Sequence, residues 1–266
     1  MRLAWLTDIH LDHLKPRREA RRAFAELVAN SADACVITGD CSSATEAHLL
    51  GDFADDNGKP VYFVLGNHDY WGSSFGGAEE HVRKLCAARS NLHWLTESGP
   101  IDIAPGVQLC GVDGWYDAEF GNWRSSDFIM VDWKKITDLR KIFQVMAGEH
   151  LVKACRERAQ MFAIKAREQL SKATAKRVFF ATHMPPFEQS AMHEGRPSTP
   201  QALPWYTSRA MGYALMIHAD KHRDQEFTTL CGHVHSASEY IEGPNHTVLC
   251  GAAEYGRPEI VRVFDL

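Results

Sequence analysis

The chain lacks the features by which composition alone marks a membrane protein or a nucleic-acid binder. Crossing a bilayer needs a run of roughly 20 apolar residues, and no run in these 266 residues approaches that length. One of the longest purely apolar runs, residues 61–65, is short. It has no excess of positive charge, because 29 Lys and Arg are set against 34 Asp and Glu, a net charge of −5. Holding nucleic acid by bulk electrostatics requires the opposite balance. We therefore expect neither a membrane span nor a nucleic-acid partner.

Signals for disulfides and for secretion are also missing. The seven cysteines form no Cys-x-x-Cys pair, and their number is odd. The N-terminus reaches Asp8, His10 and Asp12 before an apolar segment of signal-peptide length can form. We therefore expect reduced thiols and a cytoplasmic location. Histidine is abundant, with 14 residues, which suggests that imidazole groups serve a site.

The hydrophobic pattern alternates between strands and helices early in the chain and is richer in strands near its end. Helices are expected over residues 16–30, 45–56 and 78–88. Strands are expected over residues 3–7, 34–38, 61–65, 107–112, 178–182, 227–231, 247–250 and 260–264. This order predicts an α/β fold with one large sheet or a pair of sheets. Since no repeat or linker is visible, we expect a single domain over residues 1–266.

Residues 114–175 interrupt the alternation, and we interpret them as an insertion or cap within that domain. The second half is expected to be helical, because Leu151, Cys155, Ala159, Phe162, Ala166 and Leu170 recur at spacings of three and four. The first half is aromatic, with Trp115, Tyr116, Phe120, Trp123, Phe128 and Trp133. These rings fit either the core of a helical layer or the lining of a substrate pocket.

Five short strings carry the chemistry, and each directly follows an expected strand. They are Thr7-Asp8-Ile9-His10, Thr38-Gly39-Asp40, Leu65-Gly66-Asn67-His68-Asp69, Thr182-His183-Met184 and Cys231-Gly232-His233-Val234-His235. The carboxyl ends of strands in an α/β sheet meet at one edge, so these side chains should gather there. A single string of this kind is common, because Asn, Asp, His and Gly are frequent in turns. Five of them, each after a strand, are not expected from turns alone. In Asp-x-His and His-x-His, the two side chains share a face if the segment is extended.

The residue types indicate a metal site. Carboxylate, amide and imidazole groups without thiolates suit Mn, Fe, Zn, Co or Ni. Two aspartates, one asparagine and four histidines are too many ligands for one ion. The sequence therefore predicts a centre with two divalent metal ions, and Asp40 is the candidate bridge between them.

In order and spacing, this set resembles the calcineurin-like metallophosphoesterase family over residues 8–235. The resemblance implies a four-layer α/β/β/α sandwich of the metallophosphoesterase type, with residues 114–175 as a helical insertion. It implies one metal ion on Asp8, His10, Asp40 and His235, and a second on Asp40, Asn67, His183 and His233. Manganese or iron is favoured. Cys41, after Asp40, departs from many relatives and places an oxidisable thiol beside the site.

The implied activity is hydrolysis of a phosphate ester by a hydroxide that bridges the ions. His68 would donate a proton to the leaving oxygen, because neighbours on an extended segment point apart and leave it free of the metals. Asp69 would hold the His68 imidazole and raise its pKa. The expected substrate is a small phosphomonoester or phosphodiester, because Leu65 stands where protein phosphatases of the family carry arginine.

Two other functions stay open. One is a non-catalytic scaffold, which should have lost metal ligands, and the other is a nuclease, which should bring a more basic surface. The basic cluster at residues 15–22 is interpreted as a solvated helix face. His193 and Arg196, in the loop after His183, are candidates for a phosphate contact. The remaining histidines are interpreted as structural or exposed.

Overall fold

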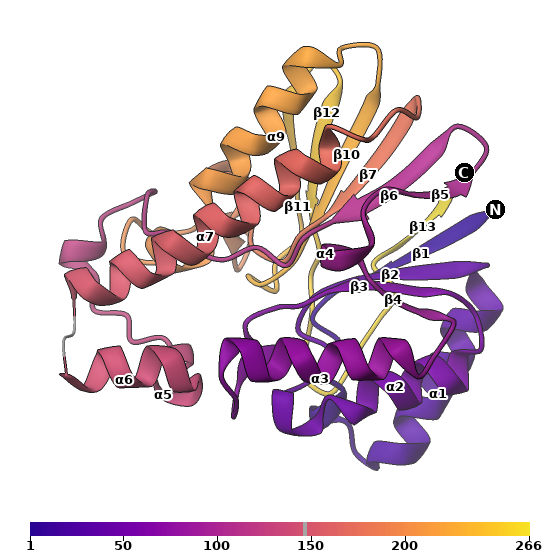
Figure 1. Ribbon diagram of the computed structural model, residues 1–266, viewed down its shortest axis with the longest axis horizontal. Helices are drawn as coiled ribbons and strands as arrows, with labels where there is room; N and C mark the ends of the chain where they lie inside the picture. Colours follow the sequence, from indigo (N-terminus) through magenta and orange to yellow (C-terminus); the bar gives the residue numbers. More distant parts are fainter. Residues whose placement is uncertain (146–147) are drawn as a thin grey trace.

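A computed structural model describes residues 1–145 and 148–266, which form two packed sheets with helices on their outer faces (Figure 1). The first sheet has the strand order β13-β1-β2-β3-β4. Its strands are β1 (Arg2–Leu6), β2 (Ala34–Thr38), β3 (Val61–Val64), β4 (Leu92–Trp94) and β13 (Arg262–Asp265). Strands β1 to β4 pair in parallel, and β13 is antiparallel at the edge.

The second sheet has the order β11-β12-β10-β7-β6-β5. Its strands are β5 (Ile101–Ala104), β6 (Val107–Gly111), β7 (Arg177–Ala181), β10 (Glu226–Cys231), β11 (Ser238–Gly243) and β12 (His246–Cys250). The four central strands are parallel, with β5 and β11 antiparallel at the edges. A separate small hairpin pairs β8 (Met192–His193) with β9 (Arg196–Pro197).

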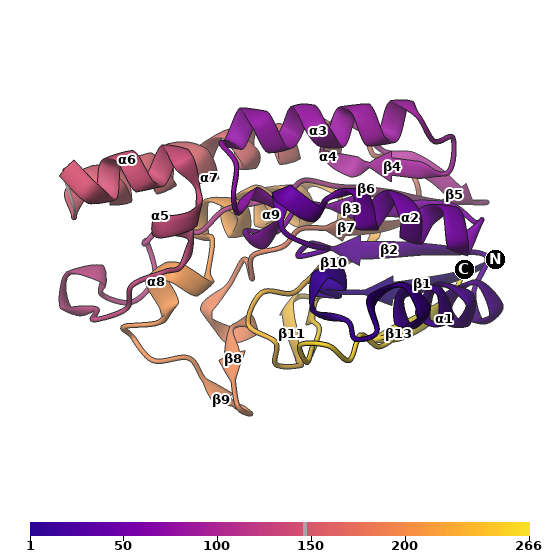
Figure 2. The same ribbon diagram turned by 90° about the horizontal axis from the view of Figure 1, so that it is seen from below.

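Helices cover both outer faces, which gives the predicted α/β/β/α order (Figures 1 and 2). The first sheet carries α1 (Arg17–Ser31), α2 (His48–Asn57) and α3 (Phe75–Ala87). The second sheet carries α7 (Glu149–Leu170) and α9 (Arg209–Lys221). Short helices are α4 (Leu95–Ser98), α5 (Asp132–Lys135), α6 (Thr137–Val145) and α8 (Leu203–Tyr206). None of these described helices combines the length and apolar character needed to cross a bilayer.

The period of two in β1 explains how the layers are held together. Leu3 and Trp5 point to the space between the sheets and pack with residues such as Phe179. Ala4 and Leu6 point the other way, into the core beneath the helices. Alternate side chains of a strand face opposite sides, so one short apolar strand contributes to both cores.

All eight predicted strands are present, with ends shifted by up to two residues. The sequence reading missed β4, β5, β8, β9 and β11. Of these, β8 and β9 have two residues each, β4 has three, and β11 is a half-exposed edge strand. It also missed α9. Helix α3 begins earlier than predicted, at Phe75, because the Ser74 side chain accepts a hydrogen bond from Gly77 N and caps it.

The segment 114–175 supplies helix α7 to the outer layer, beside α9. The six apolar residues that predicted this helix are all buried. In the aromatic half, Trp115, Tyr116 and Trp133 are buried in the core, whereas Phe128 is exposed. The buried rings favour the core interpretation for these three positions.

One residue of the basic cluster differs from the expected solvated face. Arg21 is 8% exposed, and its guanidinium pairs with Asp52 at 2.7 Å and with Asp56 at 3.0 Å. These pairs join α1 to α2, so Arg21 is part of the packing between the helices.

Candidate metal centre

The five strings follow strands β1, β2, β3, β7 and β10, and the structure brings their side chains to one edge, where the two sheets meet. Backbone hydrogen bonds join the loops, for example from Asp8 N to Gly39 O at 3.0 Å. All seven predicted ligands lie here. Five of them are buried, and His233 and His235 are half-buried.

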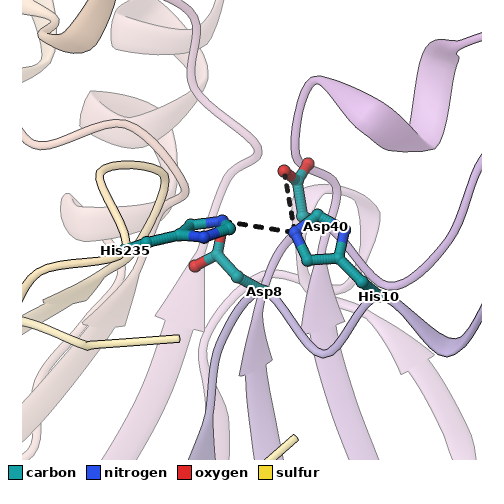
Figure 3. Close-up of side chains that lie close together, drawn as sticks. All are labelled: Asp8, His10, Asp40 and His235. Carbon is teal, nitrogen blue, oxygen red and sulfur yellow. Dashed lines mark hydrogen bonds and ion pairs between the residues drawn. The ribbon is translucent and has the colours of Figure 1, made fainter. Parts of the chain in front are cut away.

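The first ligand set is Asp8, His10, Asp40 and His235 (Figure 3). One ligand atom from each lies within 4.8 Å of those of the other three. His235 Nε2 lies 3.2 Å from His10 Nε2 and 3.3 Å from Asp8 Oδ1. His10 Nε2 is 3.9 Å from Asp40 Oδ2. Two imidazole nitrogens and two carboxylates thus converge on one point, which suits a divalent cation.

The second set consists of Asn67, His183, His233 and the other oxygen of Asp40. Asn67 Oδ1 lies 3.1 Å from His183 Nε2 and 3.0 Å from His233 Nδ1. His183 Nε2 is 3.4 Å from Asp40 Oδ1. The Asp40 carboxylate therefore lies between the two sets, with one oxygen toward each.

Backbone contacts fix which nitrogen of each imidazole faces the second set. His183 Nδ1 donates to Thr38 O at 2.8 Å, and His233 Nε2 donates to Trp205 O at 3.1 Å. A neutral imidazole has one N–H, so the other nitrogen of each ring carries a lone pair. Those lone pairs face Asn67 Oδ1, which is also an acceptor. Acceptors meeting without a donor fit a cation between them.

The charge balance of the centre also fits metal ions. Burial, followed by the nearby carboxylates of Asp8 and Asp69, raises the pKa of Asp40. Burial lowers the pKa of His10 and of His233 to about 3, so both rings are neutral at neutral pH and can bind metal. Among the described residues, no Lys or Arg pairs with Asp8 or Asp40. Cations would supply the missing positive charge.

The ligand loops have left-handed backbone, where the sequence argument assumed extended chain. Positive φ occurs at five of the seven ligands: Asp8 (48°), His10 (38°), Asp40 (53°), His233 (71°) and His235 (52°). In the described residues only two other non-glycine positions share it. This conformation costs free energy for residues with a side chain, and such costs cluster at functional sites. It turns successive side chains toward one point.

Glycine is required at Gly66 because the two ligand sets are so close. A Cβ there would overlap Asp40 Oδ1 and the backbone nitrogen of Asp40. The backbone at Gly66 must pass against Asp40 for Asn67 to reach the same site, so any side chain would separate the loops.

His68 lies at the rim of the centre, in the 3₁₀ turn His68–Tyr70. Its ring stacks on Trp71 at 3.4 Å between centroids, and its Nε2 lies 3.8 Å from Asp40 Oδ2. Burial, followed by the charges of His10 and His183, lowers the pKa of His68. The expected rise is therefore wrong for the protein without bound ions.

Asp69 does not hold the His68 imidazole as expected. Its carboxylate accepts backbone hydrogen bonds from Gly66 at 2.8 Å and from Cys41 and Ser42 at 3.0 Å. Asp69 thus ties the loop after β2 to the loop after β3. The Cys41 thiol is buried, and burial raises its pKa, which disfavours the reactive thiolate.

Three residues that the sequence reading missed surround the ligands. Tyr255 packs its ring 4.3 Å from that of His10 and 5.0 Å from that of His235. Trp71 stacks on His68, and Asp132 accepts a hydrogen bond from Asn67 Nδ2 at 2.9 Å. A charged residue directly after the apolar residues 128–131 was the one sequence signal for Asp132. The loop candidates His193 and Arg196 lie on the exposed β8–β9 hairpin (Figure 2).

Comparisons with known proteins bear on the fold and the family. A dimetal phosphatase from Danio rerio superposes with a TM-score of 0.54 at 12% identity, covering 95% of this chain and 87% of that protein. The protein TT1561 of Thermus thermophilus superposes with a TM-score of 0.54 at 13% identity, covering 98% of this chain and 99% of that protein. At these identities the two structures establish a shared fold. No curated protein matches the sequence. The model of the calcineurin-like phosphoesterases matches residues 1–237, and the chain belongs to that family.

Proposed function

We propose that the protein hydrolyses a phosphate ester with two divalent metal ions. One ion would bind Asp8, His10, Asp40 and His235, and the other Asp40, Asn67, His183 and His233. The main support is the meeting of acceptors without a donor at Asn67 Oδ1, His183 Nε2 and His233 Nδ1. The dimetal phosphatase from Danio rerio is similar in fold. Manganese or iron is the favoured metal.

The chemistry divides between the ions and the chain. Two bound ions would neutralise phosphoryl charge and activate a water molecule. The buried carboxylates and neutral imidazoles would hold the ions in a site of low dielectric, where electrostatic stabilisation is strongest. The left-handed loops would keep these groups in place before substrate binds.

His68 is the proposed proton donor to the leaving oxygen. Its Nε2 faces Asp40, while Trp71 covers one face of its ring. Because burial favours the neutral ring, His68 would take up its proton together with the anionic substrate. Removing a general acid typically costs 10²–10⁴-fold in rate. We expect His68→Ala to lower kcat by about two orders of magnitude or more and to leave metal content near normal.

The proposed substrate is a small phosphorylated molecule, either a monoester or a diester. The net charge of −5 does not favour a polyanionic partner such as nucleic acid. All seven cysteines are free thiols, which fits a reducing compartment such as the cytoplasm.

The test is reconstitution. Protein stripped with a chelator is loaded with Mn²⁺, Fe²⁺, Zn²⁺, Co²⁺ or Ni²⁺, then assayed on an aryl phosphate and on the matching diester. We expect about two ions per chain and hydrolysis of at least one ester. His68→Ala reports on the proton donor, and His81→Ala, on the exposed face of α3, is the matched control. Failure to bind ions would overturn the proposal, and two bound ions without hydrolysis of either ester would favour the scaffold alternative.

A further inference from the structure

Directly behind Asn67 lies a buried carboxylate from the segment 114–175. Asp132, the first residue of α5, is fully buried. Its Oδ1 accepts hydrogen bonds from Asn67 Nδ2 at 2.9 Å and from Trp71 Nε1 at 2.7 Å. Its Oδ2 accepts one from Tyr116 OH at 3.1 Å. All three donors are neutral, and no Lys or Arg pairs with Asp132 within residues 1–145 and 148–266.

The position of Asp132 bears on a choice that every asparagine ligand faces. An amide has an oxygen at one end and an NH₂ group at the other, and a half-turn exchanges them. Without a metal ion, the exchanged amide would suit His183 and His233 better, because its NH₂ could donate to their lone pairs. The structure shows the opposite orientation, with the oxygen toward both rings.

A carboxylate can only accept hydrogen bonds, so Asp132 discriminates between the two orientations. It bonds Asn67 Nδ2 in the observed orientation, and in the exchanged one it would meet Asn67 Oδ1, a repulsive contact between acceptors. We propose that Asp132 is a positioning residue, which holds the oxygen of Asn67 toward the second metal ion even before that ion binds. This proposal rests on the proposed function.

The same carboxylate oxygen also positions Trp71. The indole N–H of Trp71 donates to Asp132, and its ring stacks on His68. On the same indole, Lys135 Nζ lies 4.1 Å from the ring centre. Asp132 therefore links the orientation of a metal ligand to that of the proposed proton donor.

The surroundings of Asp132 indicate that it is held in place firmly. Tyr116 OH donates to Asp132 and accepts from Trp133 Nε1 at 3.1 Å. Burying a carboxylate without an ion pair costs free energy, and the three hydrogen bonds to Asp132 offset part of that cost. Because one of those hydrogen bonds comes from Asn67, Asp132 orients a proposed metal ligand in addition to packing α5.

The test measures metal binding without substrate. Metal-free protein is titrated with Mn²⁺, and calorimetry and electron paramagnetic resonance give the affinity and number of bound ions. Loss of a group that orients a ligand typically weakens metal binding by 10–100-fold. For Asp132→Ala we expect one of the two binding steps to weaken by about this factor and the other to change less than about threefold. Equal weakening of both steps, or no weakening, would overturn the proposal.

A double-mutant cycle distinguishes positioning from general destabilisation. In Asn67→Ala protein there is no amide to orient, so adding Asp132→Ala should change Mn²⁺ binding by less than about threefold. An effect as large as in the native background would show that Asp132 acts through the fold at large. Thermal unfolding of each metal-free variant shows whether it is folded.

Two further variants keep the test decisive. If Asp132→Ala does not fold, Asp132→Asn replaces it, since it keeps the shape and loses the charge. We then expect at least a threefold weakening of one step, and unchanged binding would overturn the proposal. Trp71→Phe keeps the ring but removes its N–H, and it should lower kcat about three- to tenfold with both ions still bound. An unchanged kcat would show that the hydrogen bond from Trp71 to Asp132 does not position His68. If native protein binds fewer than two ions, the proposed function itself fails.

Discussion

Replacing Asp113 by alanine tests whether one buried carboxylate holds the loop that carries Asn67. Asp113 follows β6 and is fully buried. Its Oδ1 accepts hydrogen bonds from Leu65 N and Trp94 Nε1, both at 2.8 Å, and from Thr96 Oγ1 at 2.6 Å. Its Oδ2 accepts one from Tyr70 OH at 2.9 Å. Leu65 lies two residues before Asn67, so the network reaches the candidate metal centre.

The expected loss follows from these four bonds. Asp113→Ala leaves four buried donors without an acceptor, and each such donor costs about 1–3 kcal/mol. Relaxation, water entry and relief from burying a charge offset part of that sum, so we expect a loss of about 4 kcal/mol in the free energy of unfolding. For a chain of this size that corresponds to a fall in Tm of roughly 10 °C. Asp113→Asn keeps an oxygen for three of the donors, and we expect a loss of about 1–2 kcal/mol.

The assay is urea unfolding followed by tryptophan fluorescence, with metal removed because bound ions add stability of their own. The near-ultraviolet circular dichroism of each variant shows whether the packing of its aromatic side chains is kept before urea is added. The reasoning is refuted if Asp113→Ala loses less than about 1 kcal/mol, or if Asp113→Asn is as unstable as Asp113→Ala.

Three other outcomes are expected. Asp40→Ala should lower the metal content from about two ions to less than one per chain, measured by mass spectrometry of the metals, because each of its oxygens faces a different ligand set. Retention of two ions would contradict that geometry. Burial lowers the pKa of His246 to about 3. The unfolded chain therefore binds a proton first as pH falls below about 6.5, and stability is lost from there toward the folded pKa. At pH 5 this amounts to at most about 2 kcal/mol, reduced by the Glu242 carboxylate at 3.3 Å. Metal-free His246→Gln should show a shallower loss between pH 6.5 and 5 than native protein, and parallel curves would refute this. Arg21→Met should cost about 1–2 kcal/mol in urea unfolding, because both its partners are partly buried, whereas Arg22→Met, in an exposed pair, should cost less than about 0.5 kcal/mol. Equal losses would show that burial of the pair is irrelevant.

The parts of the fold that could be predicted from sequence are those with a strong local signal. In these segments an apolar run predicts the strand, and the Gly-Asp or Gly-Asn-His that follows predicts the turn after it. Asp40 and Asn67 could therefore be placed at a sheet edge. The ordered strings also carried the resemblance to the family. By contrast, β11 is polar on its exposed face, and its position depends on pairing with β12.

The parts that could not be predicted depend on contacts between distant segments. Asp132 meets Asn67 across 65 positions of sequence, and no periodicity records that contact. The resemblance to the family implied that Asp69 holds His68, whereas a 3₁₀ turn directs the Asp69 carboxylate to the backbone of Cys41 and Gly66. The left-handed backbone at His10 could not be predicted either, because this conformation is rare in any single non-glycine residue even though histidine is enriched in it.

The position of the Asp40 carboxylate between the ligand sets has a thermodynamic consequence for metal loading. In the proposed centre, an ion on one oxygen would withdraw negative charge from the other and weaken binding of the second ion. It would also fix the plane of the carboxylate, which would strengthen that binding. Whatever factor results, it acts equally in both directions, because a coupling free energy between two sites is reciprocal. If two ions bind as proposed, a change of metal at one ligand set would alter the affinity measured at the other set.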